Sequence, residues 1–476
     1  MSKRHECPRL RPHASTGDVW GILRQKKSCL SDSAPLSCDG LRFNQTQEKN
    51  HWFRPLIVLG FELRMTTFSN VSAFSHPPSN GWPGKTLSYL LTACVLSGLC
   101  PLPLNFMPLP QAAEMSKSYT LPILDLAEDH QRQTVVDREE GQYLGHPTTC
   151  LLEDGKTVLC VYPKGHGRGA IVYKRSEDGG RTWSERLETP PSWATSLEVP
   201  TLHRVIDAHG KKRIIMWSGL YPARLAVSED DGQHWSGLRP VGDWGGIVVM
   251  GCVEPLQTGP GHYLAMFHDD GRFFTGSGKR SPSMTLYQTF SRDGGLSWST
   301  PQAIYNASSV HLCEPGLIRS PDGKEMAVLL RENARRKNSH VIFSRDEAKT
   351  WSAPKELPAA LTGDRHTGVY APDGRLFISF RDTTHQSPTK GDWVAWVGTY
   401  DDIQLGREGQ YRVRLMDNTK AADCAYPGVE MLPDGTILTT TYGHWQEGKP
   451  PYIVSIRLKL SELDTLAAKK AFLTLP

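Results

Sequence analysis

Six residues of the chain share one position in a repeated sequence unit, and most of them carry side chains that can do chemistry. Each lies eight residues before the Asp of an Asp-Gly turn or at the equivalent place, and the six are His146, Val199, Glu254, Glu314, Arg365 and Tyr426. Histidine and glutamate can transfer protons, tyrosine can act as a nucleophile, and arginine binds carboxylates through its planar fork. We therefore expect Glu254 and its counterparts to contribute to one functional surface.

A second group of polar residues ends the apolar stretch that follows each turn. It consists of Lys164, His166, Arg168, Tyr221, Arg224, His268, Asp269, Arg331, Asn333, Arg381, Asp382, Tyr442 and His444. If the two stretches of a unit form an antiparallel hairpin, the start of the first and the end of the second lie at the same end. The sequence therefore predicts that both groups meet at one rim.

The turns that would position these residues recur along the chain. The segments HPTTCLLEDG (146–155), EPGLIRSPDG (314–323) and YPGVEMLPDG (426–435) have the same Pro-to-turn spacing, and looser copies lie at 199–210, 254–261 and 365–374. An apolar stretch follows each turn, from TVLCVY in the first unit to TILTTT in the last. The chain thus has six units of short strands between about residues 125 and 465.

A second motif, S-x-D-x-G-x-x-W, occurs four times. Copies lie at 176–183, 228–235, 291–298 and, with Ala348 at the Gly position, 344–351. The Asp can accept backbone N–H bonds within a tight turn, the Gly can take a positive φ, and the Trp can pack on a neighbouring strand. Six units of this length without helical periodicity predict an all-β fold, a six-bladed β-propeller with Asp-box repeats, over residues 120–476.

These boxes resemble the Asp boxes of the sialidase superfamily, over roughly residues 130–460. The segments around Glu314 and Tyr426 are similar to those that carry a catalytic acidic residue and a nucleophilic tyrosine in sialidases. The resemblance implies a glycosidase of exo-α-sialidase type, with Tyr426 as nucleophile and Glu314 as its base. It also implies that Arg331 and Arg381 hold the substrate carboxylate, with Arg365 competing with Arg381 for the second role.

The first unit departs from the sialidase pattern. Gly145 and His146 stand where sialidases carry the first two residues of Arg-Ile-Pro, so one arginine is missing. The segment YPKGHGRGAI (162–171) contains no Asp that would match the acid/base residue of sialidases. On this interpretation Arg168 or Lys164 replaces the lost charge, and His166 serves as the acid/base.

The same departures support two other interpretations. His146 and His166 are similar to the histidines of some propeller polysaccharide lyases that act on uronate-containing glycans. Tyr221 or Tyr426 would then be the tyrosine of the lyase site, and Arg224 or Arg331 its arginine. The third interpretation is a non-catalytic propeller that binds glycans.

The charge distribution limits the classes of partner. The net charge is +4, but residues 1–114 carry 12 Lys and Arg against 7 Asp and Glu, so the remainder has no basic excess. This argues against a nucleic-acid partner and leaves an acidic glycan as the expected one. The cysteines lack metal-ligand spacing, so we expect no metal and no other cofactor, and we expect a monomer.

Residues 1–114 are predicted to be a leader outside the fold. Residues 1–64 are polar and aperiodic, which predicts disorder, and 85–113 are similar to a signal peptide. Its apolar run, 87–100, is too short for a stable membrane span, and PQAA (110–113) is the expected cleavage site. We expect a secreted or periplasmic protein; LTAC (91–94), which resembles a lipoprotein acylation box, gives the second alternative.

Overall fold

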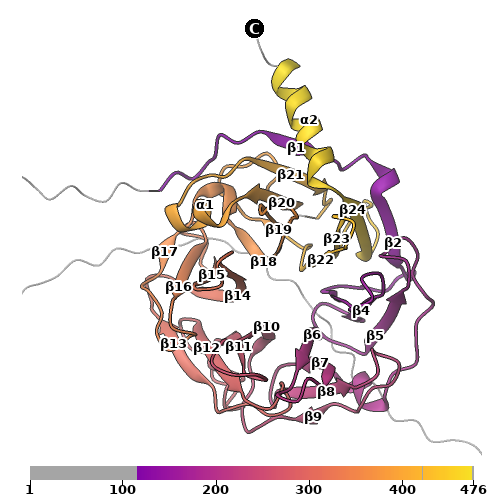
Figure 1. Ribbon diagram of the computed structural model, residues 1–476, viewed down its shortest axis with the longest axis vertical. Coiled ribbons are helices and arrows are strands. Elements are labelled where there is room, and N and C mark those ends of the chain that lie inside the picture. Colours follow the sequence, from indigo (N-terminus) through magenta and orange to yellow (C-terminus); the bar gives the residue numbers. More distant parts are fainter. Residues whose placement is uncertain (1–114, 421, 474–476) are drawn as a thin grey trace, which may run out of the picture. The chain divides into compact units, whose positions relative to one another are not determined.

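The computed structural model describes residues 115–420 and 422–473. Six antiparallel sheets, the blades, surround a central axis (Figure 1). This arrangement confirms the predicted six-bladed β-propeller. The predicted leader, with its signal peptide and acylation box, lies outside the described residues.

The blades follow one another in chain order, each with its first strand nearest the axis. Blade 1 consists of β3 (Thr148–Leu151), β4 (Val158–Pro163) and β5 (Ile171–Ser176). Blade 2 consists of β6 (Thr201–Ile206), β7 (Lys212–Ser218), β8 (Arg224–Ser228) and β9 (Arg239–Pro240). Blade 3 consists of β10 (Ile247–Pro255), β11 (Tyr263–Asp269), β12 (Thr285–Ser291) and β13 (Gln302–Asn306).

The second half of the ring repeats this plan. Blade 4 consists of β14 (Leu312–Arg319), β15 (Met326–Glu332), β16 (His340–Ser344) and β17 (Lys355–Glu356). Blade 5 consists of β18 (Gly363–Tyr370), β19 (Leu376–Asp382), β20 (Trp393–Gly398) and β21 (Tyr411–Met416). Blade 6 consists of β22 (Gly428–Met431), β23 (Ile437–Gly443) and β24 (Tyr452–Leu458).

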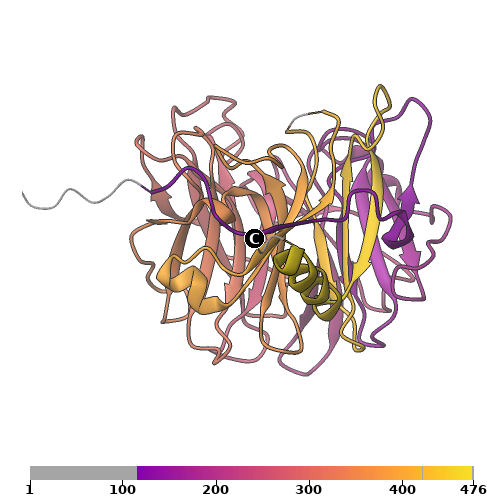
Figure 2. The same ribbon diagram turned by 90° about the horizontal axis from the view of Figure 1, so that it is seen from above.

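Residues that precede blade 1 complete the last two blades. Strand β2 (Gln133–Asp137) pairs antiparallel with β24, and β1 (Ile123–Asp125) pairs parallel with β21. The ring is thus closed by strands from both ends of the described chain, and β24 completes the last sheet. The helix α2 (Leu460–Leu473) lies on the outer flank (Figure 2), and α1 (Tyr400–Leu405) follows β20.

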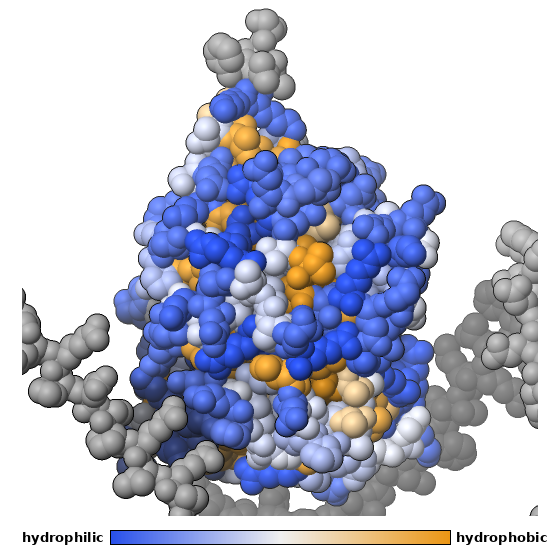
Figure 3. All heavy atoms as spheres, turned by 90° about the vertical axis from the view of Figure 1, so that its right-hand side faces the viewer, coloured by the Kyte–Doolittle hydropathy of each residue, from blue (hydrophilic) through white to orange (hydrophobic). Residues whose placement is uncertain are grey.

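Three short 3₁₀ helices complete the set of elements: η1 (His130–Arg132), η2 (Pro191–Thr195) and η3 (Ala359–Leu361). None of the described helices is long and apolar enough to cross a membrane. Figure 3 shows that the flank of the molecule facing right in Figure 1 is mostly hydrophilic, with apolar residues in small separate groups.

The Asp boxes form the turns that the sequence predicts. In the first box, Asp178 Oδ1 accepts the backbone N–H groups of Arg181 and Thr182 at 3.0 and 2.9 Å. Gly180 has φ 80°, and Ala348 of the weaker box takes a similar φ of 62°. Each box follows the third strand of its blade, at the end of that strand remote from the rim described below.

Apolar strands pack between neighbouring blades and hold the ring together. Every residue of β4 is buried, and Trp217, Phe267 and Trp298 belong to a core cluster between blades 2 and 3. Near the axis the inner strands approach closely, because a Cβ at Gly316 would lie 2.1 Å from the carbonyl oxygen of His366. The packing therefore fixes the positions of the inner strands, from which most of the site is built.

Candidate functional site

Five inner strands have a residue in the left-handed region at or near their start. These residues are His146, Val248, Glu314, Arg365 and Ala425, with φ values of 56°, 51°, 52°, 56° and 55°. The pairing register shifts at this point in β10, β14 and β18, as at a β-bulge. Non-glycine residues rarely adopt this conformation, and its recurrence at one rim marks a surface on which the fold retains backbone strain.

A pocket of about 360 Å³, the rim pocket, opens at this place. Its lining residues come from blades 1, 2, 3, 4 and 6 and include His146, His166, Arg168, Glu198, Arg272, Phe273, Glu314 and Tyr426. The structure thus brings five predicted site residues together, and adds Glu198 and Arg272. No cluster of three or more His, Cys, Asp or Glu side chains suited to a metal occurs in the described part of the chain.

Tyr426 and Glu314 form a buried pair at the rim pocket. The Tyr426 hydroxyl donates a short hydrogen bond to Glu314 Oε1, which also accepts from Arg331 Nη1 at 2.7 Å. Glu314 Oε2 is buried and has no hydrogen-bond partner among the described residues. The backbone N–H of Glu314 donates to His268 Nδ1 at 3.2 Å, which helps to fix the strained strand start.

The electrostatic environment gives the two partners different protonation states. Burial, together with the charge of Glu314, raises the pKa of Tyr426 well above its usual range. Burial also acts to raise the pKa of Glu314, but the Arg331 and Arg381 guanidiniums and the Tyr426 hydrogen bond together outweigh this effect, and the pKa of the carboxyl is lowered. Tyr426 is therefore a neutral donor and Glu314 an ionised acceptor.

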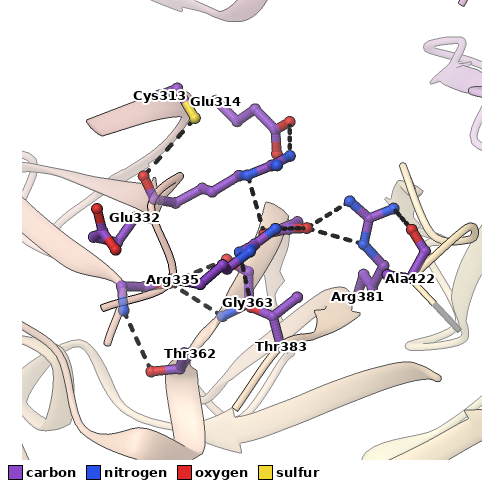
Figure 4. A network of polar contacts seen from close by, with 12 residues as sticks. Cys313, Glu314, Glu332, Arg335, Thr362, Gly363, Arg381, Thr383 and Ala422 are labelled. Carbon is purple, nitrogen blue, oxygen red and sulfur yellow. Dashed lines mark hydrogen bonds and ion pairs between the residues drawn. The ribbon is translucent and has the colours of Figure 1, made fainter. Parts of the chain in front are cut away.

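Three arginines surround a buried carboxylate next to this pair. Arg335 donates to both Asp364 oxygens at 2.6 and 2.7 Å, Arg381 Nε donates to Oδ2 at 2.9 Å, and Arg331 Nε lies 3.4 Å from Oδ1. Figure 4 shows this network, with Glu314, Arg335 and Arg381 labelled. Burial acts to raise the pKa of Asp364, but the arginines hold it well below its usual range. The network contains three cations for two carboxylates, so positive charge remains next to Tyr426.

Arg365 adds to this positive charge. Its side chain is buried, Nη1 donates to the Gly251 carbonyl oxygen at 2.9 Å, and its guanidinium lies 6.0 Å from the centre of the Tyr426 ring. It forms no ion pair with a described carboxylate, and burial lowers its pKa. The expected clamp arginines Arg331, Arg365 and Arg381 thus lie around the pocket without lining it.

Two other arginines line the rim pocket. The exposed Arg168 side chain has no hydrogen bond or ion pair within the described part of the chain. Arg272 Nε donates to Asp270 Oδ1 at 2.8 Å, but its two Nη groups have no described partner and the side chain is 40% exposed. An unpaired guanidinium in a pocket is suited to bind an anionic ligand.

Glu198 is a functional candidate that the sequence analysis missed. Its Oε1 accepts the backbone N–H of Val199 at 2.9 Å, and its side chain lines the rim pocket. Burial raises its pKa to about 7, against the lowering effects of the Val199 hydrogen bond and of Arg168. The carboxyl is thus poised to give or take a proton near neutral pH. The available signal was the triplet Glu198-Val199-Pro200, in which Glu stands one position earlier than in Glu314-Pro315.

The two histidines of blade 1 have different surroundings. His146 is buried, its Nδ1 accepts the N–H of Gly167 at 3.2 Å, and its Nε2 lies 3.2 Å from the Tyr442 hydroxyl. Burial lowers the pKa of His146 well below its usual range. Because both ring nitrogens have protein partners and the ring stays neutral, His146 is poorly placed to exchange a proton with a ligand.

His166 is more accessible, with a side chain that is 66% exposed. Its Nδ1 lies 2.7 Å from the Tyr143 hydroxyl and 3.4 Å from Asp423 Oδ1. Tyr143 also explains the missing arginine, because a Cβ at Gly145 would lie 2.5 Å from the Tyr143 ring. Lys164 does not replace that charge at the pocket, since it pairs with Glu139 at 2.9 Å.

Three further expected site residues also do not line the rim pocket. Glu254 lies at the far end of β10 and accepts from Arg319 Nε at 2.8 Å. The strand β10 has nine residues, and its left-handed residue is Val248. Counting eight residues back from the turn therefore selects Glu254, which lies near the opposite end of this long strand. Tyr221 donates to Asp243, and Arg224 donates to Thr195.

Comparison with known proteins identifies the repeat and the fold. A model described as a BNR repeat-like domain matches residues 214–438. A search of curated proteins gives no match. Among solved structures, a protein of unknown function from Dyadobacter fermentans DSM 18053 is 17% identical, with a TM-score of 0.53 over 69% of this chain and 98% of that chain.

Two enzymes are more distant structural neighbours. The α-L-arabinanase of Penicillium chrysogenum is 14% identical, with a TM-score of 0.49 over 70% of this chain and 98% of its own. The intramolecular trans-sialidase of Ruminococcus gnavus is 13% identical, with a TM-score of 0.48 over 67% and 95%. Together with the repeat match, the six blades confirm the expected Asp-box propeller.

Proposed function

We propose that the protein is a glycosidase of sialidase type that releases a terminal anionic sugar from a glycan. The observation that carries the proposal is the buried hydrogen bond from Tyr426 to the ionised Glu314, at a pocket lined by the unpaired Arg168. A nucleophile bonded to its base is the arrangement that covalent catalysis requires.

The reaction proceeds in two steps. In the first, Tyr426 gives its proton to Glu314 and its oxygen bonds to the anomeric carbon, while the bond to the leaving oxygen breaks and Glu198 protonates that oxygen. In the second, water bonds to the anomeric carbon and loses a proton to Glu198. As that bond forms, the bond from the anomeric carbon to the Tyr426 oxygen breaks, and Tyr426 recovers its proton from Glu314. Two displacements at one carbon retain its configuration.

The charges around the pocket favour an anionic sugar. Arg168 and Arg272 come from loops of blades 1 and 3, so they can approach a carboxylate from two sides. The arginines around Asp364 and the buried Arg365, which has no ion pair among the described residues, add positive charge near the site. A neutral phenol also suffers less repulsion from a substrate carboxylate than an ionised aspartate would.

A lyase is the second candidate, because one exposed histidine at the pocket has the partners of a general base. His166 contacts both Tyr143 and Asp423. On this alternative His166 removes a proton from the carbon next to a uronate carboxylate. The bond to the leaving oxygen then breaks, Tyr143 protonates that oxygen, and a carbon–carbon double bond remains in the sugar.

One experiment separates the alternatives. The protein is incubated with sialylated glycans and with uronate polysaccharides, and free sialic acid and the ultraviolet absorbance of unsaturated uronate are measured. The glycosidase proposal predicts free sialic acid, which Tyr426→Phe abolishes and His166→Ala leaves largely intact. Unsaturated uronate that depends on His166 would establish the lyase instead. No product from either class would leave a binding protein and overturn both enzymatic proposals.

A further inference from the structure

A second pocket lies at the same rim, between blades 3 and 4. This loop pocket has a volume of about 500 Å³ and is lined by Asp270, Arg280, Ser281, Pro282, Ser283, Met284, His311 and Asn333. His311 directly precedes β14, the strand that carries Glu314, and Asn333 directly follows β15, the strand that carries Arg331. The loop pocket is therefore built on the elements that carry Glu314 and Arg331.

One loop contributes walls to both pockets. The segment 270–284 joins β11 to β12; its first part supplies Arg272 and Phe273 to the rim pocket, and its last part lines the loop pocket. Asp270 connects the two parts, because its carboxylate accepts from Arg272 Nε at 2.8 Å and lies 3.2 Å from Arg280 Nε. This ion-paired bridge thus links the walls of the two pockets.

The loop is held in shape by its own contacts. Asp269 Oδ2 accepts the backbone N–H groups of Gly271, Phe273 and Phe274 at 2.7, 3.1 and 3.1 Å. The Phe274 ring stacks on Tyr287 with 4.3 Å between the ring centres. A ligand would therefore meet a preformed loop, which lowers the entropic cost of binding.

The lining of the loop pocket is polar and close to charge balance. The Asp270 side chain is 2% exposed, and its charge is matched by Arg280, which is 70% exposed. The Asn333 side chain has no hydrogen-bond partner within the described residues and can both donate and accept. Ser281, Ser283 and His311 add further polar groups, and Met284 adds an apolar surface. Such a lining suits the hydroxyl groups and apolar ring face of a neutral sugar.

We infer that the loop pocket is the subsite for a neutral sugar on the leaving-group side of the scissile bond. This inference rests on the proposed function. The terminal anionic sugar fills the rim pocket, and the next sugar of the glycan passes the Arg272–Asp270 bridge into the loop pocket. The protein then recognises at least two sugars, and substrates without the second sugar lose the contribution of Asn333.

The test compares two substrates that share one anionic sugar. Sialyllactose carries a neutral galactose next to the scissile bond, and 4-methylumbelliferyl sialoside carries a flat aryl group there. Asn333→Ala should lower kcat/KM for sialyllactose about 5-fold, the scale of one hydrogen bond, and change the aryl substrate less than about 2-fold. Ser281→Phe, which fills the pocket, should lower sialyllactose cleavage further, and its activity on the aryl substrate shows that it folds.

The control is Lys279→Ala, which changes an exposed residue of the same loop that does not line the pocket. It should leave both substrates unchanged. Equal losses on the two substrates, or no loss on sialyllactose in either pocket variant, would overturn the subsite while leaving the proposed function in place. If the unaltered protein cleaves neither substrate, the proposed function fails and the subsite fails with it.

Discussion

The arginines near the rim form two sets with different surroundings. Arg331, Arg335 and Arg381 converge on Asp364 and are engaged by buried or partly buried carboxylates. Arg168 and Arg272 line the pocket, and Arg168 has no ion pair among the described residues. Strand ends supply Arg331 and Arg381, and loops supply Arg335, Arg168 and Arg272. The difference teaches that a position in the repeat places an arginine at the rim, whereas its partners decide whether a ligand can use it.

The largest effect should come from the pair that lies between the two sets. Tyr426→Phe removes the nucleophilic oxygen, so kcat should fall by at least about 10³-fold while the melting temperature changes little. Tyr442→Phe is the matched control, because this buried tyrosine of the same blade contacts His146 and not Glu314. If Tyr426→Phe kept a tenth of the activity, tyrosine catalysis would be excluded.

The arginines that converge on Asp364 should contribute more to the free energy of unfolding than the two that line the pocket. Asp364→Ala leaves three arginines with Glu314 as their remaining acid, so it should lower the free energy of unfolding by about 3–5 kcal/mol. Arg168→Ala removes an exposed, unpaired side chain and should cost less than about 0.5 kcal/mol. Denaturant titrations followed by tryptophan fluorescence measure both values. If both variants lost a similarly small free energy of unfolding, the proposed difference between the two sets of arginines would be wrong.

Glu198 should control the pH dependence of the reaction. Burial raises its pKa to about 7, so the acid needed for leaving-group departure is present below this pH and is lost as the pH rises through it. The kcat/KM of the unaltered protein for sialyllactose should therefore fall above pH 7.

Glu198→Gln should lower cleavage of sialyllactose about 10²-fold and flatten the alkaline limb. An aryl sialoside, whose leaving group needs less protonation, should be affected less. An unchanged alkaline limb in the Gln variant would assign the acid/base role to another group.

The sequence predicted the fold and the placement of Glu314 and Tyr426 at one rim because both depend on short-range, repeated patterns. Asp178 and its counterparts specify turns, and Glu314 and Tyr426 occupy one repeated position. Glu254 was misplaced because β10 is long enough to move its unit's start to Val248.

The missed features depend on contacts between distant segments. Asp364 belongs to blade 5 but pairs with Arg331 of β15 and with Arg335 of the loop after it, both in blade 4. No local sequence pattern predicts such a pair. Arg272 comes from a loop outside the repeat, so nothing in the unit spacing points to it. Only the structure shows that Asp270 holds Arg272 through Nε and leaves its two Nη groups without a described partner.

The most direct test of the account asks whether a pocket arginine recognises the substrate carboxylate. Arg168→Ala and the control Arg224→Ala are assayed on an aryl sialoside and on its methyl ester, which lacks the negative charge. The account predicts that Arg168→Ala lowers kcat/KM for the acid about 10- to 100-fold, the scale of one to two charge-assisted hydrogen bonds, with little change for the ester. Arg224→Ala should alter neither. Equal effects of Arg168→Ala on the acid and the ester, or none on the acid, would contradict the account.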